Sequence, residues 1–339
     1  MSTDTIDIKV LGRYLEQEIL GFIGLKKADK FSGGQSNPTY LLTADSGQYV
    51  LRTKPQGILL KSAHAVDREF RVIQALKEFD VPVPHALHLS PEPSVIGTMF
   101  YVMSFEKGRI FWDPALPDLS KNERMAIYCE MNRILATLHS LDVAQIGLSD
   151  YGKPGNYFQR QISRWSGQYL DSVDIPDANM QRLIDWLPAN IPIDDGQISL
   201  IHGDFRLDNL IFDNNGFSAI ALLDWELSTL GHPYADLAYQ CMQLRMAHSG
   251  VLKGLGGINR TKLGIPSEAE YVRLYCHNRG IAEIPHWHFY LCFSFFRFAS
   301  ILHGVMKRAE SGNASSKQAQ DYGRLAPILA QMAVTLIEP

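Results

Sequence analysis

Apolar residues recur at helical spacing near the start of the chain and at strand spacing through most of the first hundred residues. Ile8, Leu11 and Leu15 share one helical face, which predicts a helix over residues 6–20. A second apolar stripe predicts an amphipathic helix over residues 64–80. Short apolar runs predict strands at residues 31–43, with a Gly-rich turn inside, at 49–54 and at 99–105.

From about residue 120 the pattern becomes helical. Ser120 and Glu123 form a Ser-x-x-Glu capping box before a predicted helix at 122–141. Further helices are predicted at 157–171, 178–187, 234–248, 267–279, 286–309 and 316–337, with two or three short strands in the charged segment before residue 226. The pattern predicts an α+β chain, with a small β-rich lobe over residues 1–105 and a larger, mostly helical lobe over residues 106–339.

The composition is that of an ordinary globular protein: of 339 residues, 46% are hydrophobic and 20% are charged. This length suffices for two domains at roughly 150 residues each. The formal net charge of −4 predicts neither a nucleic acid nor an anionic membrane as a partner of the whole surface. The apolar stretch at 287–306 contains His288, Arg297 and His303, so we expect a core helix there rather than a membrane span.

The cysteines and the first residues bear on the cellular compartment. Cys129, Cys241, Cys276 and Cys292 form no Cys-x-x-Cys pair, and a chain of this size needs no disulfides, so we expect reduced thiols. The first seven residues contain neither the basic nor the apolar part of a secretory signal. The sequence therefore predicts a cytoplasmic protein.

The residues with the most distinctive chemistry lie between 202 and 226. Asp204 supplies a carboxylate that can take a proton from a hydroxyl, and Asn209 an amide oxygen that can bind a hard cation. Asp224 follows a buried-strand pattern, where an unpaired carboxylate is costly, so a metal is its natural partner. Alone, Asp204 would be a turn residue and Asn209 a cap. Together the three side chains predict phosphoryl transfer, which requires a base, oxygen ligands for Mg²⁺ and positive charge.

Two motifs carry a resemblance to a known family. His202-Gly-Asp204 with Asn209, and Leu223-Asp-Trp-Glu226, resemble the aminoglycoside phosphotransferase and choline kinase-like superfamily. The resemblance implies a bilobal protein-kinase-like fold whose small N-terminal lobe contains an antiparallel sheet. It also implies transfer of the γ-phosphoryl group of ATP to a hydroxyl, with Asp204 as the base and Mg²⁺ held by Asn209 and Asp224.

Longer strings narrow the resemblance. Tyr49-Val-Leu-Arg52, Asp67-Arg-Glu69 and Gly231-His-Pro233 are similar to the kinase-like domains fused to, or encoded beside, acyl-CoA dehydrogenases. The sequence departs from the protein-kinase pattern where Gly203 replaces an Arg, and where Trp225 and Glu226 replace the Phe and Gly after the metal-binding Asp. Glu226 is a secondary metal or water ligand, or a plain surface residue.

The resemblance also implies phosphate-binding side chains. Arg52 takes the place on the third strand where this fold usually presents Lys to the nucleotide, and Glu69 would be its ion-pair partner. Lys54, on the same strand face, could share this role. Arg206 stands where protein kinases have a Lys beside the γ-phosphoryl group; an ion pair with Asp208 is the alternative.

Other nucleotide contacts are implied on the backbone. A Gly-rich turn would cover the phosphates with N–H groups, although a simple hairpin explains it equally well. A strand would face the adenine, or would simply be core. These residues are Gly33, Gly34, Ser36 and Asn37 in the turn, and Tyr101 and Met103 in the strand. Asp236 is expected to bond the backbone of residues 202–204, and His202 and His139 to be buried scaffold residues.

The motifs predict a reaction and leave the acceptor open. Residues 230–339 contain eleven Lys or Arg against seven Asp or Glu, which suits an anionic acceptor, and the resemblance suggests a hydroxyacyl-CoA. The arginines and aromatics considered for this acceptor are Arg245, Arg273, Arg279, Arg297, Phe289, Tyr290, Phe295 and Phe296; the aromatics are otherwise helix core. The alternatives are an aminoglycoside, small-sugar or amino-alcohol kinase, and a non-catalytic nucleotide-binding pseudokinase. The sequence predicts no oligomeric state.

Overall fold

The computed structural model describes residues 6–31, 37–55, 65–91, 93–250, 252–310 and 318–338, and the chain folds as two compact units. The first unit comprises Met1–Ile110, Ile146–Leu148 and Asp208–Ser228. The second comprises Phe111–Gln145, Ser149–Leu207 and Thr229–Pro339. The first unit thus contains Asn209 and Asp224 as well as the N-terminal region, whereas Asp204 belongs to the second unit.

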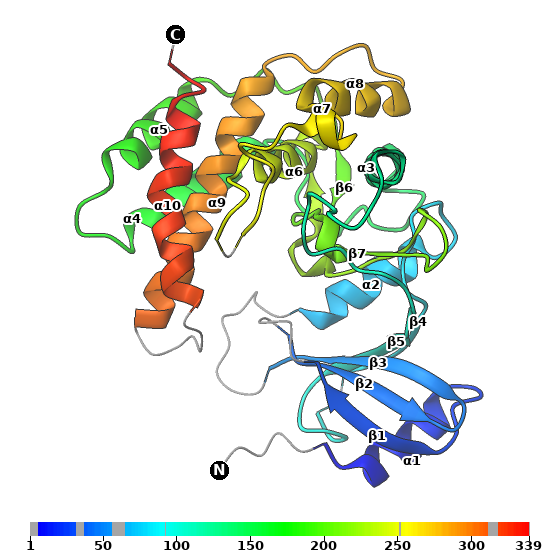
Figure 1. Ribbon diagram of the computed structural model, residues 1–339. Helices are drawn as coiled ribbons and strands as arrows, with labels where there is room; N and C mark the ends of the chain where they lie inside the picture. The colour runs from blue at the N-terminus through cyan, green and yellow to red at the C-terminus, as the bar shows by residue number, and fades with distance from the viewer. Residues whose placement is uncertain are drawn as a thin grey trace. The chain divides into compact units, whose positions relative to one another are not determined.

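A five-stranded antiparallel sheet forms most of the first unit, in the order β1-β2-β3-β5-β4 (Figure 1). Its strands are β1 (Leu25–Lys30), β2 (Thr39–Ala44), β3 (Gly47–Thr53), β4 (Ala86–Ser90) and β5 (Phe100–Ser104). The α+β class and the antiparallel N-terminal sheet are therefore confirmed. The first strand is nevertheless misplaced in the prediction, because it ends at Lys30 rather than beginning at Phe31.

Two helices cover opposite faces of this sheet (Figure 1). They are α1 (Ile8–Glu18) and α2 (Val66–Leu76). Leu11 and Leu15 of α1 are fully buried in one apolar cluster with Phe100 of β5. The next residue of the strand, Tyr101, points to the other face because side chains alternate along a strand. There its ring meets Phe70 of α2 edge to face, with ring centroids 5.9 Å apart.

A short antiparallel pair completes the first unit. It consists of β7 (Leu210–Phe212) and β8 (Ala219–Leu222), with single 3₁₀ turns η1 (Leu207–Asn209) before it and η2 (Trp225–Leu227) after it. The backbones of Arg109 and Phe212 exchange two hydrogen bonds of 2.8 and 2.9 Å. Gly108 permits this approach, because a Cβ atom there would overlap the carbonyl oxygen of Phe212.

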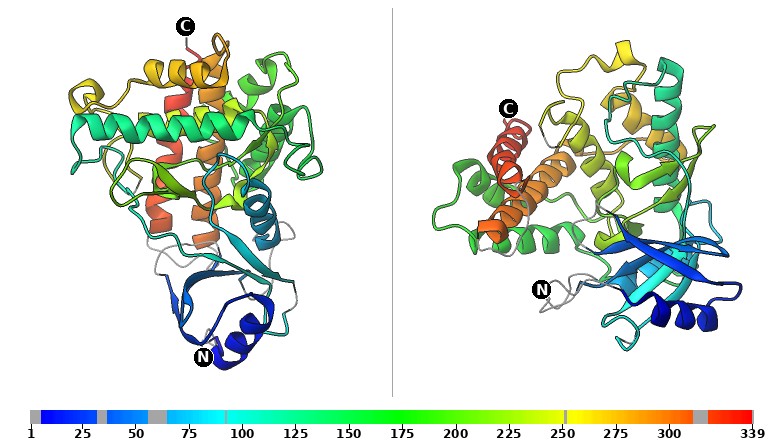
Figure 2. Two further views of the ribbon diagram at one scale, coloured as in Figure 1. Left: turned by 90° about the vertical axis from the view of Figure 1, so that its right-hand side faces the viewer. Right: turned by 60° about the horizontal axis from the view of Figure 1, so that its bottom comes forward.

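The second unit is mainly helical. It contains α3 (Lys121–Ser140), α4 (Tyr157–Leu170), α5 (Ala178–Ala189), α6 (Tyr234–Arg245), α7 (Arg260–Leu263), α8 (Glu268–Arg279), α9 (Trp287–Glu310) and α10 (Gln318–Val334), with the paired strands β6 (Ser199–Ile201) and β9 (Thr229–Gly231). Helices α9 and α10 lie side by side in Figures 1 and 2, and α4 and α5 pack against them. α6 packs against α9, and α3 packs against α8 and β6.

Local signals placed the helices of this unit well. The capping box at Ser120 and Glu123 is present at the start of α3. The short helix α7 and the strand β4 were not predicted, because neither shows enough apolar periodicity. All four cysteines are free, as expected.

Helix α9 contains the apolar stretch noted in the sequence. Trp287–Lys307 has the length and mean hydropathy, 1.4, of a segment that could cross a membrane, but 72% of it is buried inside the protein. Phe295 and Phe296 at its centre are fully buried. This burial is what a core helix shows.

The close approach at Gly108 gives a test of the fold. Gly108→Ala should lower the free energy of unfolding by about 1–3 kcal/mol, because backbone atoms of Phe212 cannot yield to the added methyl group. Gly167→Ala in α4 is the matched control. Its new Cβ would have no neighbour within 4 Å, and helical Ala is favoured over Gly by roughly 0.5–1 kcal/mol. Urea denaturation measures the free energy of unfolding of both variants. Equal changes in Gly108→Ala and Gly167→Ala would contradict the packing argument.

Candidate active site

Arg52 of β3 lies at the centre of a charged cluster in the first unit. Its Nε atom lies 2.9 Å from Oε2 of Glu69, which confirms the predicted ion pair. Its Nη2 atom donates a hydrogen bond of 2.5 Å to Oδ1 of Asp224. The same nitrogen lies 3.7 Å from a carboxylate oxygen of Glu226. One guanidinium therefore faces three carboxylates.

Two further side chains complete what we call the Arg52 cluster: Asn37, Arg52, Glu69, Tyr101, Asp224 and Glu226. The amide of Asn37 donates to Oε1 of Glu69 at 2.7 Å, and the hydroxyl of Tyr101 donates to Oε2 at 3.3 Å. Sheet register explains the arrangement, because Arg52 and Tyr101 are directly paired across β3 and β5 and share one face. The resemblance placed Asn37 and Tyr101 near nucleotide; the structure shows both bonding to Glu69.

Burial sets the electrostatics of the cluster. The side chain of Glu69 is 1% exposed, and burial raises its pKa to about 7 despite the opposing effect of Arg52. Burial also lowers the pKa of Arg52, but Glu69 and Asp224 together outweigh this effect and hold it above its ordinary value. The guanidinium therefore stays charged.

Asn209 and Asp224 emerge at the same end of the β7–β8 ladder. Leu210 pairs with Leu222, and the N–H of Leu223 donates to the carbonyl of Asn209 at 2.8 Å. Asp224 adopts a left-handed backbone conformation, φ 65°, which costs of order 1–3 kcal/mol in a residue other than Gly and tends to occur at functional sites. Amide and carboxylate oxygens are the kind of ligand that fits a hard cation such as Mg²⁺.

These two ligands would not hold a metal alone. Among the described residues, no group of three or more His, Cys, Asp or Glu side chains could bind a metal ion. Mg²⁺ differs from metals that need such a cage, because one or two protein groups usually hold it together with phosphate oxygens of the substrate. The donors present therefore fit a metal that arrives with a phosphorylated ligand.

In the second unit, Asp236 at the start of α6 fixes the segment that leads to Asp204. Its carboxylate accepts the backbone N–H groups of His202 at 2.6 Å and Gly203 at 2.8 Å, which confirms the predicted role. His139 of α3, also buried, lies 3.3 Å from the same carboxylate. Burial raises the pKa of Asp236, but its bond to His139 and its other donors outweigh that and bring it below the ordinary value.

Asp204 itself is partly exposed and has a partner that the sequence analysis missed. The hydroxyl of Tyr239 donates to its Oδ1 atom at 2.8 Å. Tyr239 stands three residues after Asp236 on α6, so both side chains project from one face of the helix. The spacing of three residues between Asp236 and Tyr239 was the sequence signal that could have identified Tyr239.

The other predicted residues fall into different surroundings. Arg206 is partly exposed in the second unit, two residues after Asp204. Met103 is buried in β5. Gly33, Gly34 and Ser36 lie outside the described residues.

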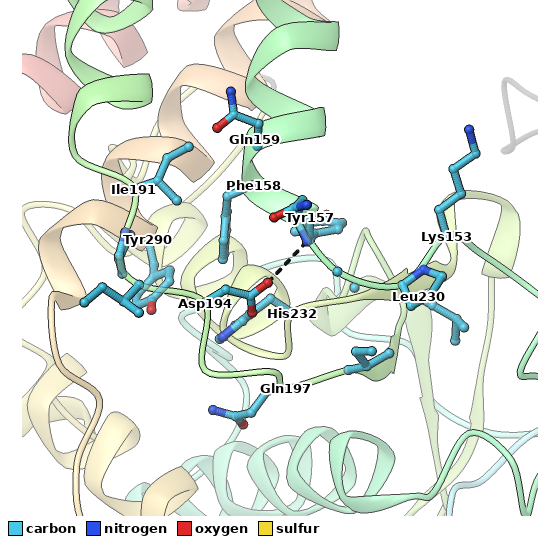
Figure 3. Close-up of a pocket in the computed structure, with 17 residues that line it drawn as sticks. Lys153, Tyr157, Phe158, Gln159, Ile191, Asp194, Gln197, Leu230, His232 and Tyr290 are labelled. Carbon is cyan, nitrogen blue, oxygen red and sulfur yellow. Dashed lines mark hydrogen bonds between the residues drawn. The ribbon is translucent and has the colours of Figure 1, made fainter.

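The second unit contains a cavity of about 160 Å³ (Figure 3). The first turn of α4, with Tyr157 and Phe158, lines it together with His232 and Tyr290. The ring planes of His232 and Tyr290 lie within 18° of parallel. Gly231 also lines the cavity, and it pairs with Ser199 at one end of the β6–β9 ladder. The chain runs from the other end of this ladder, at Ile201, towards residue 204. Asp204 is not among its lining residues.

The arginines considered for an anionic acceptor are mostly engaged elsewhere. Arg245 makes two hydrogen bonds of 2.6 Å to Glu268, and Arg297 donates to the carbonyl of Gly203 at 3.0 Å. Arg279 bonds the carbonyl of His139. The aromatic residues considered with them on α9 are at most 4% exposed. They are helix core, although Tyr290 also lines the cavity shown in Figure 3.

Comparison with known proteins agrees with this geometry. A model described as the phosphotransferase enzyme family matches residues 27–261. A solved structure from Ralstonia eutropha JMP134, provisionally described as an aminoglycoside phosphotransferase, is 46% identical, with a TM-score of 0.90 over 98% of both chains. The chain belongs to the phosphotransferase enzyme family and is a kinase-type enzyme with the corresponding kinase-like fold.

Two other similar proteins bear on this family assignment. Acyl-CoA dehydrogenase family member 10 of Mus musculus is 46% identical over 325 residues, which cover 94% of this chain and 30% of that protein. The chain spans less than half the length of the curated relatives it matches. Spectinomycin phosphotransferase, solved with ADP and spectinomycin, shares the fold at a TM-score of 0.66 and 14% identity, over 98% of this chain and 99% of that one.

The raised pKa of Glu69 predicts a pH-dependent stability. Between its ordinary value of 4.5 and about 7, the folded protein keeps a proton that the unfolded chain has lost. The free energy of unfolding should therefore fall as pH rises through this window, by up to about 1.4 kcal/mol per pH unit. Glu69→Gln should lack this component. Urea denaturation of the wild type and of Glu69→Gln from pH 4.5 to 8 measures the free energy of unfolding at each pH. The same pH dependence in both proteins would contradict the prediction.

Proposed function

We propose that this protein transfers the γ-phosphoryl group of ATP to a hydroxyl group of a small molecule, with Mg²⁺. The observation that carries the proposal is the Arg52 cluster, in which a buried, charged guanidinium holds Asp224 at the end of the ladder that also carries Asn209. Phosphoryl transfer relies on positioned positive charge and metal ligands more than on covalent chemistry by the protein. The spectinomycin enzyme was solved with ADP and aminoglycoside 2'-phosphotransferase-IIIa with GDP, which supports a purine nucleotide as donor, and we choose ATP.

Each residue has a defined role in this proposal. Asn209 and Asp224 hold Mg²⁺, which neutralises phosphate charge when bound. Arg52 holds Glu69 and Asp224 in place, and Arg206 can present a positive charge to the phosphates. Asp204 accepts the proton of the acceptor hydroxyl, or orients that hydroxyl for attack.

For the acceptor we favour a hydroxyacyl-CoA. Support comes from the 46% identity to an acyl-CoA dehydrogenase family member, against 14% to the spectinomycin enzyme. An aminoglycoside or amino alcohol is the second candidate, because the Ralstonia protein at 46% identity is described in those terms. A non-catalytic nucleotide-binding protein is the third, and it predicts binding without turnover.

A transfer assay separates these acceptors. The protein is incubated with γ-labelled ATP, Mg²⁺ and, separately, 3-hydroxyacyl-CoA of several chain lengths, spectinomycin, streptomycin, choline and simple sugars. Labelled acyl-CoA alone would support the favoured acceptor. Labelled antibiotic or choline with unlabelled acyl-CoA would overturn it in favour of the second candidate. Bound ATP with no labelled product or released phosphate would overturn phosphoryl transfer itself.

Replacing the proposed base should affect chemistry and spare binding. Asp204→Ala should lower kcat by about 10²–10⁴-fold, the usual effect of losing general-base catalysis, with less than a twofold change in ATP affinity. Kinetics and equilibrium binding of ATP·Mg²⁺ measure the two effects. Asp185→Ala, at an exposed position of α5, is the control and should match the wild type. Parallel losses of affinity and rate in Asp204→Ala would argue for a structural role of Asp204.

A further inference from the structure

Tyr239 contacts the carboxylate to which the proposed function assigns proton transfer. The residue lies on α6, its side chain is buried, and its hydroxyl donates to Oδ1 of Asp204 at 2.8 Å. The bond joins residues 35 positions apart in the sequence. It is therefore a tertiary contact between α6 and the segment after β6, and both lie in the second unit.

The ring of Tyr239 is held on two sides. The ring of Phe298 meets it edge to face at 90°, with centroids 5.7 Å apart. The guanidinium carbon of Arg297 lies 5.3 Å from its centroid. Arg297 is 8% exposed and also donates to the carbonyl of Gly203, next to Asp204. Two consecutive residues of α9 thus fix the tyrosine, and one of them also fixes the chain beside the base.

The protonation state of the hydroxyl identifies it as the donor in this hydrogen bond. Burial raises the pKa of Tyr239 far above its ordinary value, and the charge of Asp204 raises it further. The phenol therefore keeps its proton and acts as a donor to the carboxylate. A bond from a neutral hydroxyl to one oxygen sets the plane of the carboxylate and leaves its charge in place. Proton transfer needs such orientation, because reaction rates fall steeply with small errors of position.

We infer that Tyr239 is a positioning residue for phosphoryl transfer, which orients Asp204 towards the acceptor hydroxyl while Arg297 and Phe298 hold its ring. This inference rests on the proposed function, in which Asp204 is the base. The competing explanation is that Tyr239 is a core tyrosine whose hydroxyl merely needs a hydrogen-bond partner. The two explanations differ in whether the loss of rate on replacing Tyr239 depends on the presence of Asp204.

The test replaces Tyr239 with Phe, which removes the hydroxyl and keeps the ring. The assays are phosphate release from ATP·Mg²⁺ with water as acceptor, and transfer from ATP·Mg²⁺ to 3-hydroxyacyl-CoA. We expect Tyr239→Phe to lower kcat about 10- to 100-fold, with less than a twofold change in the KM for ATP. In an Asp204→Ala background the same change should have no further effect, because residues that act as a unit are not additive.

Tyr128→Phe is the matched control. Tyr128 is also a buried tyrosine, and its hydroxyl donates to the carbonyl of Pro114 at 2.6 Å, away from Asp204. It should lose comparable stability and retain full activity. Thermal unfolding of every variant shows that the fold is retained, and Tyr239→His replaces the Phe variant in the same comparisons if that variant does not fold.

The outcomes separate the two proposals. A wild-type protein that binds ATP·Mg²⁺ but neither releases nor transfers phosphate overturns the proposed function, and the inference with it. An active wild type with a fully active Tyr239→Phe variant overturns the inference alone. Equal losses in Tyr239→Phe and Tyr128→Phe, or an undiminished loss in the Asp204→Ala background, would show that Tyr239 is structural.

Discussion

A guanidinium that is removed from water must be surrounded by acceptors, because an unpaired buried charge costs several kcal/mol. The side chain of Arg52 is 13% exposed, and this requirement links three separate parts of the first unit. Arg52 comes from β3, Glu69 from α2, and Asp224 from the turn after β8. Replacing Arg52 would leave the buried carboxylate of Glu69 without its cation. The ion pair with Arg52 also ties the side chain of Asp224 to the sheet.

The cluster also contains more negative than positive charge. One guanidinium faces Glu69, Asp224 and Glu226, so three carboxylates share a single cation. The raised pKa of Glu69 is a consequence of this surplus together with burial. Arg suits the position better than Lys would, because its fork can contact Glu69 and Asp224 through different nitrogens. This surplus of negative charge around Asp224 also favours the approach of a divalent cation.

The sequence predicted most helices and the charged segment because those signals are local. Each of these signals lies within a short stretch of sequence: the capping box at Ser120, the apolar stripes, and the spacing of Asp204, Asn209 and Asp224. The contacts that complete the site are not local. Tyr239 reaches Asp204 across 35 residues, and the bond depends on how α6 meets the segment after β6. Arg297 was considered among several arginines for an anionic acceptor, and its internal partner, the carbonyl of Gly203, could not be foreseen because a backbone group leaves no trace in the sequence.

The two principal carboxylates of the segment have partners of different kinds, and this difference fits their proposed roles. Asp224 has a cation, Arg52, beside it, so it can share or exchange that cation for another without leaving a buried charge unpaired. Asp204 has a neutral hydroxyl, from Tyr239, which orients a carboxylate without cancelling its charge. These contacts are the structural support for the different roles that we propose for two chemically identical side chains 20 residues apart.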